Sequence, residues 1–256
     1  MRRIAIVGGA GRMGQVMALG LGQSDDMFVA ALVDTSQPRE LFGAHFATSL
    51  DQLEASDVDV VVDFSTPVGA ERSGAWCAEH AVALVLGVTG LSDEQRRAIE
   101  RAGQRTSIVM ASNFSLGAVL SERFAVMAAR YFDRVEIIEL HHDSKVDAPS
   151  GTSISTAHAI AEARTDAGRP RLVEPTTRYS VAGARGADVA QGIVVHSVRL
   201  PGLVAHQEIL FASPGEGLTI RHDSYDRDSF VRGVDLAIRS MSTSPGLVLG
   251  IDTFLE

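Results

Sequence analysis

The chain reads Arg3-Ile-Ala-Ile-Val-Gly-Gly-Ala-Gly-Arg-Met-Gly14 near its N-terminus, a short β-branched run that ends in closely spaced glycines. The residues from Gly9 to Gly14 fit the pattern G-x-G-x-x-G, and the apolar side chains that follow are spaced as in a helix. Glycine lacks the Cβ that would keep a pyrophosphate away from the backbone, and a helix N-terminus supplies free amides and a favourable dipole. A strand, a glycine turn and a helix in this order predict the start of a dinucleotide-binding domain.

A second β-rich run, residues 28–33, ends at Asp34, which lies about 20 residues beyond the glycine turn. An acid at this place accepts hydrogen bonds from both ribose hydroxyls of an adenine nucleotide and repels a 2′-phosphate, which favours NADH. Arg12 and Arg39 would either supply positive charge near the same pocket or lie on the surface as solvated arginines. NADPH therefore stays open as an alternative cofactor.

Strands and helices continue to alternate as far as Phe114. Strands are expected at residues 58–64, 81–86 and 107–111, a helix after Ser65-Thr-Pro67, and another helix at residues 92–103. Continuous apolar strands separated by helices indicate a parallel sheet with helices on both faces, a Rossmann-type doubly wound fold. Because ligands of such sheets bind beyond the carboxyl ends of the strands, the loops Gly87-Val-Thr-Gly90 and Ala111-Ser-Asn-Phe114 are candidates for nucleotide contact. Each is equally well explained as an ordinary connection.

The pattern changes after Phe114. Helices are expected at residues 117–131 and 152–164, and strands at residues 134–140, 192–200, 203–212 and 217–222, with Pro-Gly turns between the last three. This predicts a second, α+β domain with a mostly antiparallel sheet over residues 115–222. A final helix at residues 227–241 and a strand at residues 246–251 are expected to return to the first domain. That domain would then comprise residues 1–114 and 223–256.

The densest group of reactive side chains lies in Glu139-Leu-His-His-Asp-Ser-Lys-Val-Asp-Ala-Pro-Ser-Gly-Thr152. His141, His142 and Lys145 are bases and cations, and Ser150-Gly-Thr152 precede a helix whose first amides attract an anion. Adjacent strand residues point to opposite faces, so the two histidines are not expected to share a metal ion, and we expect no metal site.

Hydride transfer to a C=N bond requires a proton to arrive with the hydride. A histidine near neutral pKa is the natural donor, and a nearby lysine would hold an anion and polarise the acceptor. The alternative is a polar surface loop in which Asp147 or Ser150 caps the following helix.

Composition excludes several other classes. The net charge of −9 argues against a nucleic-acid partner. No apolar run approaches the roughly 18–20 residues of a membrane span, and the N-terminal run is too short for a signal peptide, so we expect a cytoplasmic protein. Cys77 is the only cysteine. It excludes an intrachain disulfide and is better explained as a small buried hydrophobe than as a nucleophile.

The sequence resembles the dihydrodipicolinate reductase family, the 4-hydroxy-tetrahydrodipicolinate reductases of bacterial lysine and diaminopimelate biosynthesis. The matching pieces run in the family's order over almost the whole chain. They are Gly8-Gly-Ala-Gly-Arg-Met-Gly14, Val62-Asp-Phe-Ser65, Gly87-Val-Thr-Gly90, Ser112-Asn-Phe-Ser115, the stretch from Glu139 to Thr152, Arg185-Gly186 and His196-Ser-Val-Arg199. The His-His-x-x-Lys-x-Asp-Ala-Pro-Ser-Gly-Thr element is the most specific of these.

The resemblance implies an NAD(P)H-dependent reduction of a cyclic imine dicarboxylate to tetrahydrodipicolinate, by a homotetramer built through the β-rich domain. His141 would be the proton donor and acceptor, and Lys145 a second donor. A substrate carboxylate would be bound by His142, Gly151 and Thr152. The nucleotide would be held by Gly8, Gly9, Ala10, Gly11, Arg12, Met13, Asp34, Gly87, Val88, Thr89, Ala111, Ser112, Asn113 and Phe114.

Two positions depart from the family pattern. Thr35 follows Asp34 where some members carry an arginine that supports NADPH, so the choice between NADH and NADPH stays open. Val88 stands where threonine is usual, a change that should matter little if backbone groups make the contact.

Two other functions are weighed against this one. Another two-domain dehydrogenase, acting on a semialdehyde or an amino acid, would need a catalytic cysteine or a different placement of lysine and aspartate. A non-catalytic regulator that responds to nucleotides would need a helix-turn-helix or a basic surface, and the sequence indicates neither.

Overall fold

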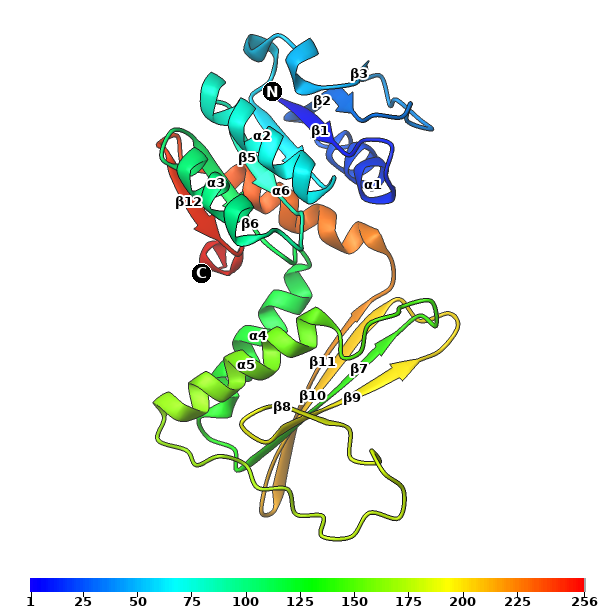
Figure 1. The fold of residues 1–256 in the computed structure, drawn as a ribbon, viewed down its shortest axis with the longest axis vertical. Coiled ribbons are helices and arrows are strands. Elements are labelled where there is room, and N and C mark those ends of the chain that lie inside the picture. Colours follow the sequence, from blue (N-terminus) through cyan, green and yellow to red (C-terminus); the bar gives the residue numbers. More distant parts are fainter. Residues whose placement is uncertain (256) are drawn as a thin grey trace. The chain divides into compact units, whose positions relative to one another are not determined.

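The computed structural model describes residues 1–255, and the chain forms two compact units (Figure 1). The first unit contains Met1–Leu116 and the chain from Arg227 onward, and the second is Gly117–Asp226. The two boundaries between the units lie a few residues later than the sequence indicated. The first falls at the start of helix α4 (Leu116–Ala129), and the second follows strand β11 (Glu216–Ser224).

The first unit is built on a seven-stranded sheet in which every neighbouring pair is parallel. In the order β12-β6-β5-β4-β1-β2-β3, the strands are Gly246–Leu249, Ser107–Met110, Ala83–Leu86, Val60–Asp63, Arg2–Val7, Met27–Val33 and His45–Ala47. The predicted Rossmann-type sheet is confirmed. Strand β12 adds to the sheet beside β6, so the chain returns to the first unit at its C-terminal end.

Helices pack on both faces of this sheet. They are α1 (Arg12–Leu21), α2 (Pro67–His80), α3 (Asp93–Gly103) and α6 (Val231–Ser240), with short 3-10 turns η1 (Leu50–Gln52), η2 (Ala55–Asp57), η3 (Arg227–Phe230) and η4 (Asp252–Phe254). Ala5 of β1 lies in one core cluster with Trp76 of α2 and Ile99 of α3. Because strand side chains alternate, the buried Ile4 and Ile6 face the opposite side, where α1 contacts β1.

Local signals place the helix starts of this unit. Thr66 caps α2 through its side chain, with Pro67 in the first turn, and Ser92 caps α3 in a reciprocal capping box with Gln95. Cys77 on α2 is fully buried, and burial raises the pKa of its thiol. It packs as the small hydrophobe that the sequence indicated.

The second unit is a five-stranded sheet in the order β11-β10-β7-β9-β8, in which only the β7–β9 pair is parallel. Besides β11, the strands are β7 (Arg134–His141), β8 (Ala187–Ala190), β9 (Ile193–Arg199) and β10 (Ala205–Ser213). The predicted mostly antiparallel sheet is confirmed. Apolar residues of α4 and α5 (Gly151–Asp166) form a core with Val135 and Ile137 of β7.

Alternation along β7 fixes where its polar side chains go. Val135 and Ile137 face the helices, so Glu139 and His141 point to the same side, and Glu136 points to the other. Glu139 therefore lies on the helix-covered face near the end of the strand, where it is fully buried. Among the described residues, no helix is both long and apolar enough to cross a membrane.

Candidate active site

The glycine turn of the first unit leaves no room for a Cβ at two of its positions. Gly8 has a left-handed φ of 82°, and a Cβ there would lie 3.0 Å from the backbone of Phe64. A Cβ on Gly14 would lie 2.1 Å from the carbonyl oxygen of Gly8. Helix α1 begins after Gly11 without a side-chain cap. The turn therefore needs glycine at these places and leaves the first amides of α1 without a capping side chain, which fits the binding of a pyrophosphate.

Asp34 is held beside this turn by backbone amides. Its carboxylate accepts hydrogen bonds from the amides of Ala10 (3.0 Å) and Ser36 (3.2 Å). The acid is thus oriented before any ligand arrives, at the end of β2 and next to the glycine turn. Arg12 and Arg39, which were considered as alternative charges, are both exposed.

The two other candidate loops offer mainly backbone. Val88 is 8% exposed and Phe114 1%, and the ring of Phe114 packs edge-on against Phe64 at 5.7 Å. A Cβ on Gly87 would lie 2.2 Å from the ring of Phe64. The predicted cofactor positions Val88, Ala111 and Phe114 are therefore buried, while Thr89 and Ser112 are exposed. Any contact that these buried residues make with a nucleotide would come from their peptide groups.

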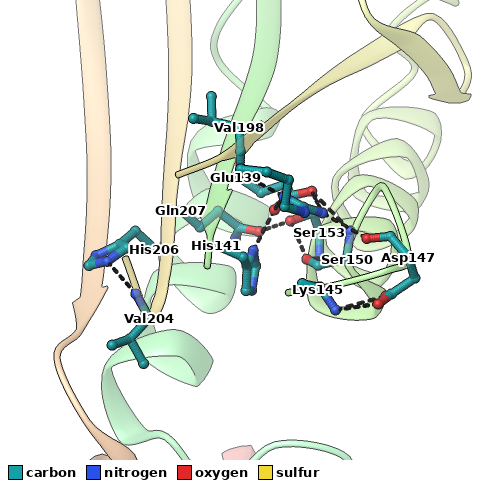
Figure 2. A network of polar contacts seen from close by, with 11 residues as sticks. Glu139, His141, Lys145, Asp147, Ser150, Ser153, Val198, Val204, His206 and Gln207 are labelled. Atoms are coloured by element: carbon teal, nitrogen blue, oxygen red, sulfur yellow. Dashed lines mark hydrogen bonds and ion pairs between the residues drawn. The ribbon is translucent and has the colours of Figure 1, made fainter. Parts of the chain in front are cut away.

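In the second unit, a single buried carboxylate gathers the end of β7 into a network (Figure 2). Arg199 of β9 donates from Nη1 to Glu139 Oε2 and from Nη2 to Oε1, each at 2.8 Å. His141 Nδ1 lies 2.5 Å from Glu139 Oε2. The amide of Ser150 donates to Oε1 at 3.3 Å. One side chain thus binds the arginine, the candidate proton donor and the start of α5.

The charges of this network shift two pKa values. Burial alone would raise the pKa of Glu139, but hydrogen bonds from Arg199, Ser197 and His141 outweigh it and hold that pKa below its usual value. Burial lowers the pKa of His141, an effect that Glu139 partly offsets by stabilising the imidazolium. Glu139 is therefore ionised at neutral pH.

The loop after β7 carries the other candidate residues. Lys145 Nζ donates to both carboxylate oxygens of Asp147, at 2.7 and 2.8 Å. His142 Nδ1 lies 2.7 Å from the hydroxyl of Ser144, so the two histidines have different partners. Asp147 does not cap α5. Its carboxylate pairs with Lys145, and its carbonyl accepts from Arg199 Nη2 at 2.8 Å.

The N-terminus of helix α5 is exposed. Ser150 is the N-cap, and its hydroxyl accepts from the Ser153 amide at 3.2 Å. Gly151 and Thr152 are exposed, and a Cβ on Gly151 would meet nothing within 4 Å. The first turn of α5 contains no acidic residue, so the helix dipole favours a carboxylate there.

Three side chains of this network were given no role in the sequence analysis. They are Glu139, Arg199 and Gln207. Gln207 of β10 accepts from Ser153 Oγ at 2.7 Å and donates to Thr156 Oγ1 at 3.2 Å, which ties α5 to the sheet. Strand patterning alone signals them only as polar residues at inward-facing positions of apolar strands.

Comparison with known proteins identifies the family of both units. Residues 2–114 match the family described as dihydrodipicolinate reductase, N-terminus, and residues 117–255 match dihydrodipicolinate reductase, C-terminus. A 4-hydroxy-tetrahydrodipicolinate reductase of Nocardia farcinica is 45% identical over 99% of this chain and 98% of its own length. One of Mycolicibacterium vanbaalenii is 44% identical over 99% of both chains.

A solved structure agrees as well. Dipicolinate-bound dihydrodipicolinate reductase from a Paenisporosarcina species is 38% identical, with a TM-score of 0.88 over 99% of both chains. The fold and the family match define a two-domain oxidoreductase that uses a pyridine nucleotide. The chain belongs to the dihydrodipicolinate reductase family.

Proposed function

We propose that this enzyme reduces 4-hydroxy-tetrahydrodipicolinate to tetrahydrodipicolinate, a step of diaminopimelate and lysine biosynthesis. The observation that carries the proposal is the match over 99% of both chains to a reductase solved with dipicolinate, a cyclic dicarboxylate. The loop after β7 supports it, because a candidate acid and an open helix N-terminus stand on the same short segment. A cyclic imine dicarboxylate needs both a proton and a site for an anion.

We assign the roles in the second unit as follows. His141 donates the proton, and Lys145 acts as a second donor that leaves Asp147 to meet the substrate. His142 and the exposed amides of Gly151 and Thr152 bind a carboxylate. The neutral Ser144 hydroxyl orients the His142 ring for that task.

The nucleotide supplies the hydride when it is bound. We assign its pyrophosphate to the turn from Gly8 to Met13, its adenine ribose to Asp34, and the rest to the loops that carry Gly87 to Thr89 and Ala111 to Phe114. The backbone bonds that hold Asp34 support a preference for NADH, because the oriented carboxylate would repel a 2′-phosphate. Thr35 adds no positive charge to oppose this.

We also propose that the protein is a cytoplasmic homotetramer that binds neither nucleic acid nor a membrane. The outer face of the second sheet supports the assembly. It carries half-buried Ile138 and Leu140 on β7 and Leu210 on β10, and α4 and α5 pack on the other face. A mixed apolar face of this kind is typical of a subunit contact.

The test is a coupled assay with the product of dihydrodipicolinate synthase as substrate, following nucleotide absorbance with NADH and NADPH separately. We expect oxidation of either nucleotide only when the substrate is supplied, and a higher kcat/KM with NADH. Absence of substrate-dependent oxidation with both nucleotides would reject the function. A higher kcat/KM with NADPH would reject only the cofactor preference.

A further inference from the structure

Two clusters of the same three residue types form around glutamates that lie on opposite faces of strand β7. The buried triad comprises Glu139, Arg199 and His141, and the outer triad comprises Glu136, Arg185 and His196. In the outer triad, His196 Nε2 lies 2.8 Å from Glu136 Oε2, and Arg185 binds both oxygens of the carboxylate. The clusters differ in burial, because the Glu139 side chain is 0% exposed and that of Glu136 is 34% exposed.

We propose that Glu139 is the positioning residue of the proton donor. It holds His141 in the tautomer that bears hydrogen on Nδ1, so that Nε2 is the atom that receives and delivers the catalytic proton. This inference rests on the proposed function, in which His141 is the acid, and it extends that function to a residue that does not touch the substrate.

The hydrogen-bond chemistry of the pair fixes the tautomer. An ionised carboxylate accepts hydrogen bonds and donates none. The His141 nitrogen that lies 2.5 Å from Glu139 must therefore carry the hydrogen and donate it. Among residues 1–255, Nε2 of the same ring has no hydrogen-bond partner. The ring is thus bonded on one side and open on the other, as proton transfer to a ligand requires.

Arg199 keeps the carboxylate ionised. Its two charge-assisted bonds occupy both oxygens of Glu139, which makes protonation of that carboxylate unfavourable. Transfer of the His141 proton to the substrate is therefore favoured over its transfer to Glu139. Without the arginine, the buried acid would itself compete for the proton.

Glu139 also aligns the acid with the anion site. The bond from the Ser150 amide to Oε1 fixes the N-cap of α5, directly before Gly151 and Thr152. The same carboxylate therefore sets the position of the donor ring and the start of the helix. A small displacement of Glu139 would move both relative to a bound substrate.

The charges around His141 predict the sign of the pH effect. Glu139 on its own strand raises the pKa of His141, whereas Lys145 in the following loop and Arg199 on β9 lower it. On β10, the residue in register with Glu139 is the uncharged Gln207. Replacing Glu139 by glutamine would remove the one charge that raises this pKa, so His141 would lose its proton at lower pH.

The experiment compares Glu139→Gln with Glu136→Gln, which changes the equivalent carboxylate of the outer triad. In the wild type we expect kcat/KM to fall as pH rises through the pKa of His141. In Glu139→Gln this fall should move to lower pH, and kcat should drop by about 10-fold or more, as expected for impaired acid catalysis. In Glu136→Gln, which leaves the charges beside His141 unchanged, the fall should stay at the wild-type pH. A fall at unchanged pH in Glu139→Gln would overturn the proposal.

Nitrogen-15 NMR of histidine side chains provides a second readout that needs no turnover. The His141 signals are identified by their loss in His141→Gln. Above the pKa, the ligand-free wild type should show the tautomer with hydrogen on Nδ1, and Glu139→Gln should show a mixture. Hydrogen on Nε2 in the wild type would overturn the proposal even if Glu139→Gln does not fold. An inactive wild type that shows the expected tautomer would instead reject the proposed function alone.

Discussion

The buried and outer triads use the same residue types around two glutamates of β7, yet only the buried one adjoins the start of helix α5. Inside the unit, Glu139 is removed from water and each of its bonds is strengthened by the low dielectric. On the outer face, Glu136 shares Arg185 with Glu174 and is 34% exposed in the single chain. Residue type and pairing therefore do not distinguish the two triads. What distinguishes the buried triad is the burial of its carboxylate and the exposed start of helix α5 beside it.

The largest expected difference is between replacing His141 and replacing His196. His141→Gln should lower kcat by about 100-fold or more, because an acid catalyst contributes about 10²–10⁴-fold. His196→Gln should leave kcat within about twofold, since its bond to Glu136 is partly solvated. Steady-state kinetics at the pH optimum measures both. Equal losses in the two variants would abolish the distinction between the triads.

The two arginines should differ next most strongly, in stability. Arg199→Met leaves the buried Glu139 charge without its main partner, and loss of one partner of a buried pair costs about 3–5 kcal/mol. Arg185→Met removes a half-exposed pair, for which about 0–1 kcal/mol is usual. Urea unfolding followed by circular dichroism gives both free energies. A loss of stability in Arg185→Met as large as that in Arg199→Met would contradict this account.

A smaller effect is expected at the cation beside the buried triad. Lys145 is the only lysine among the 23 lysines and arginines of the chain. Lys145→Ala should raise KM and lower kcat, together lowering kcat/KM by about 10-fold or more, the equivalent of one bond to a charged group at about 1.5–3 kcal/mol. Arg171→Ala, which breaks a similar ion pair with Asp188, is the matched control and should leave both constants unchanged. Normal KM and kcat in Lys145→Ala would reject its role.

The smallest effect concerns a carboxylate outside both triads. Asp34 is held by backbone amides rather than by arginine. Asp34→Ala should raise the KM for NADH by about fivefold, the loss of about 1 kcal/mol of hydrogen bonding. It should not raise the KM for NADPH, because the repulsion of the 2′-phosphate is removed. Changes in the buried triad should leave the ratio of the two KM values intact. Equal changes for both nucleotides in Asp34→Ala would remove the ribose assignment, and Asp51→Ala on η1 serves as the control.

Much of the fold was accessible from the sequence because it is encoded locally. The parallel strands are continuous apolar runs, and the caps Thr66, Ser92 and Ser150 mark helix starts within one turn. Strands β3 and β8 were not predicted. They are short and partly exposed edge strands, and three or four residues carry too little periodicity to recognise.

Part of the candidate site was likewise predictable from local sequence, and part was not. His141, Lys145 and Gly151 lie in one segment of the sequence, so their types and spacing already suggest an acid next to an anion site. Arg199 lies 60 residues from Glu139 and reaches it only because β9 pairs in parallel with β7. Both residues lie in motifs that resemble the family, but neither could be given a role from the sequence, since nothing local indicates that they meet.

The glycine turn, the sheet that follows it and the reactive loop could all be predicted from the sequence, because backbone conformation and apolar periodicity depend on near neighbours. Only the tertiary structure shows which carboxylate is buried, which arginine pairs with it and which nitrogen of His141 lacks a partner among residues 1–255. These depend on strand pairing across the sheet and on removal from water, and both arise only when distant segments pack together.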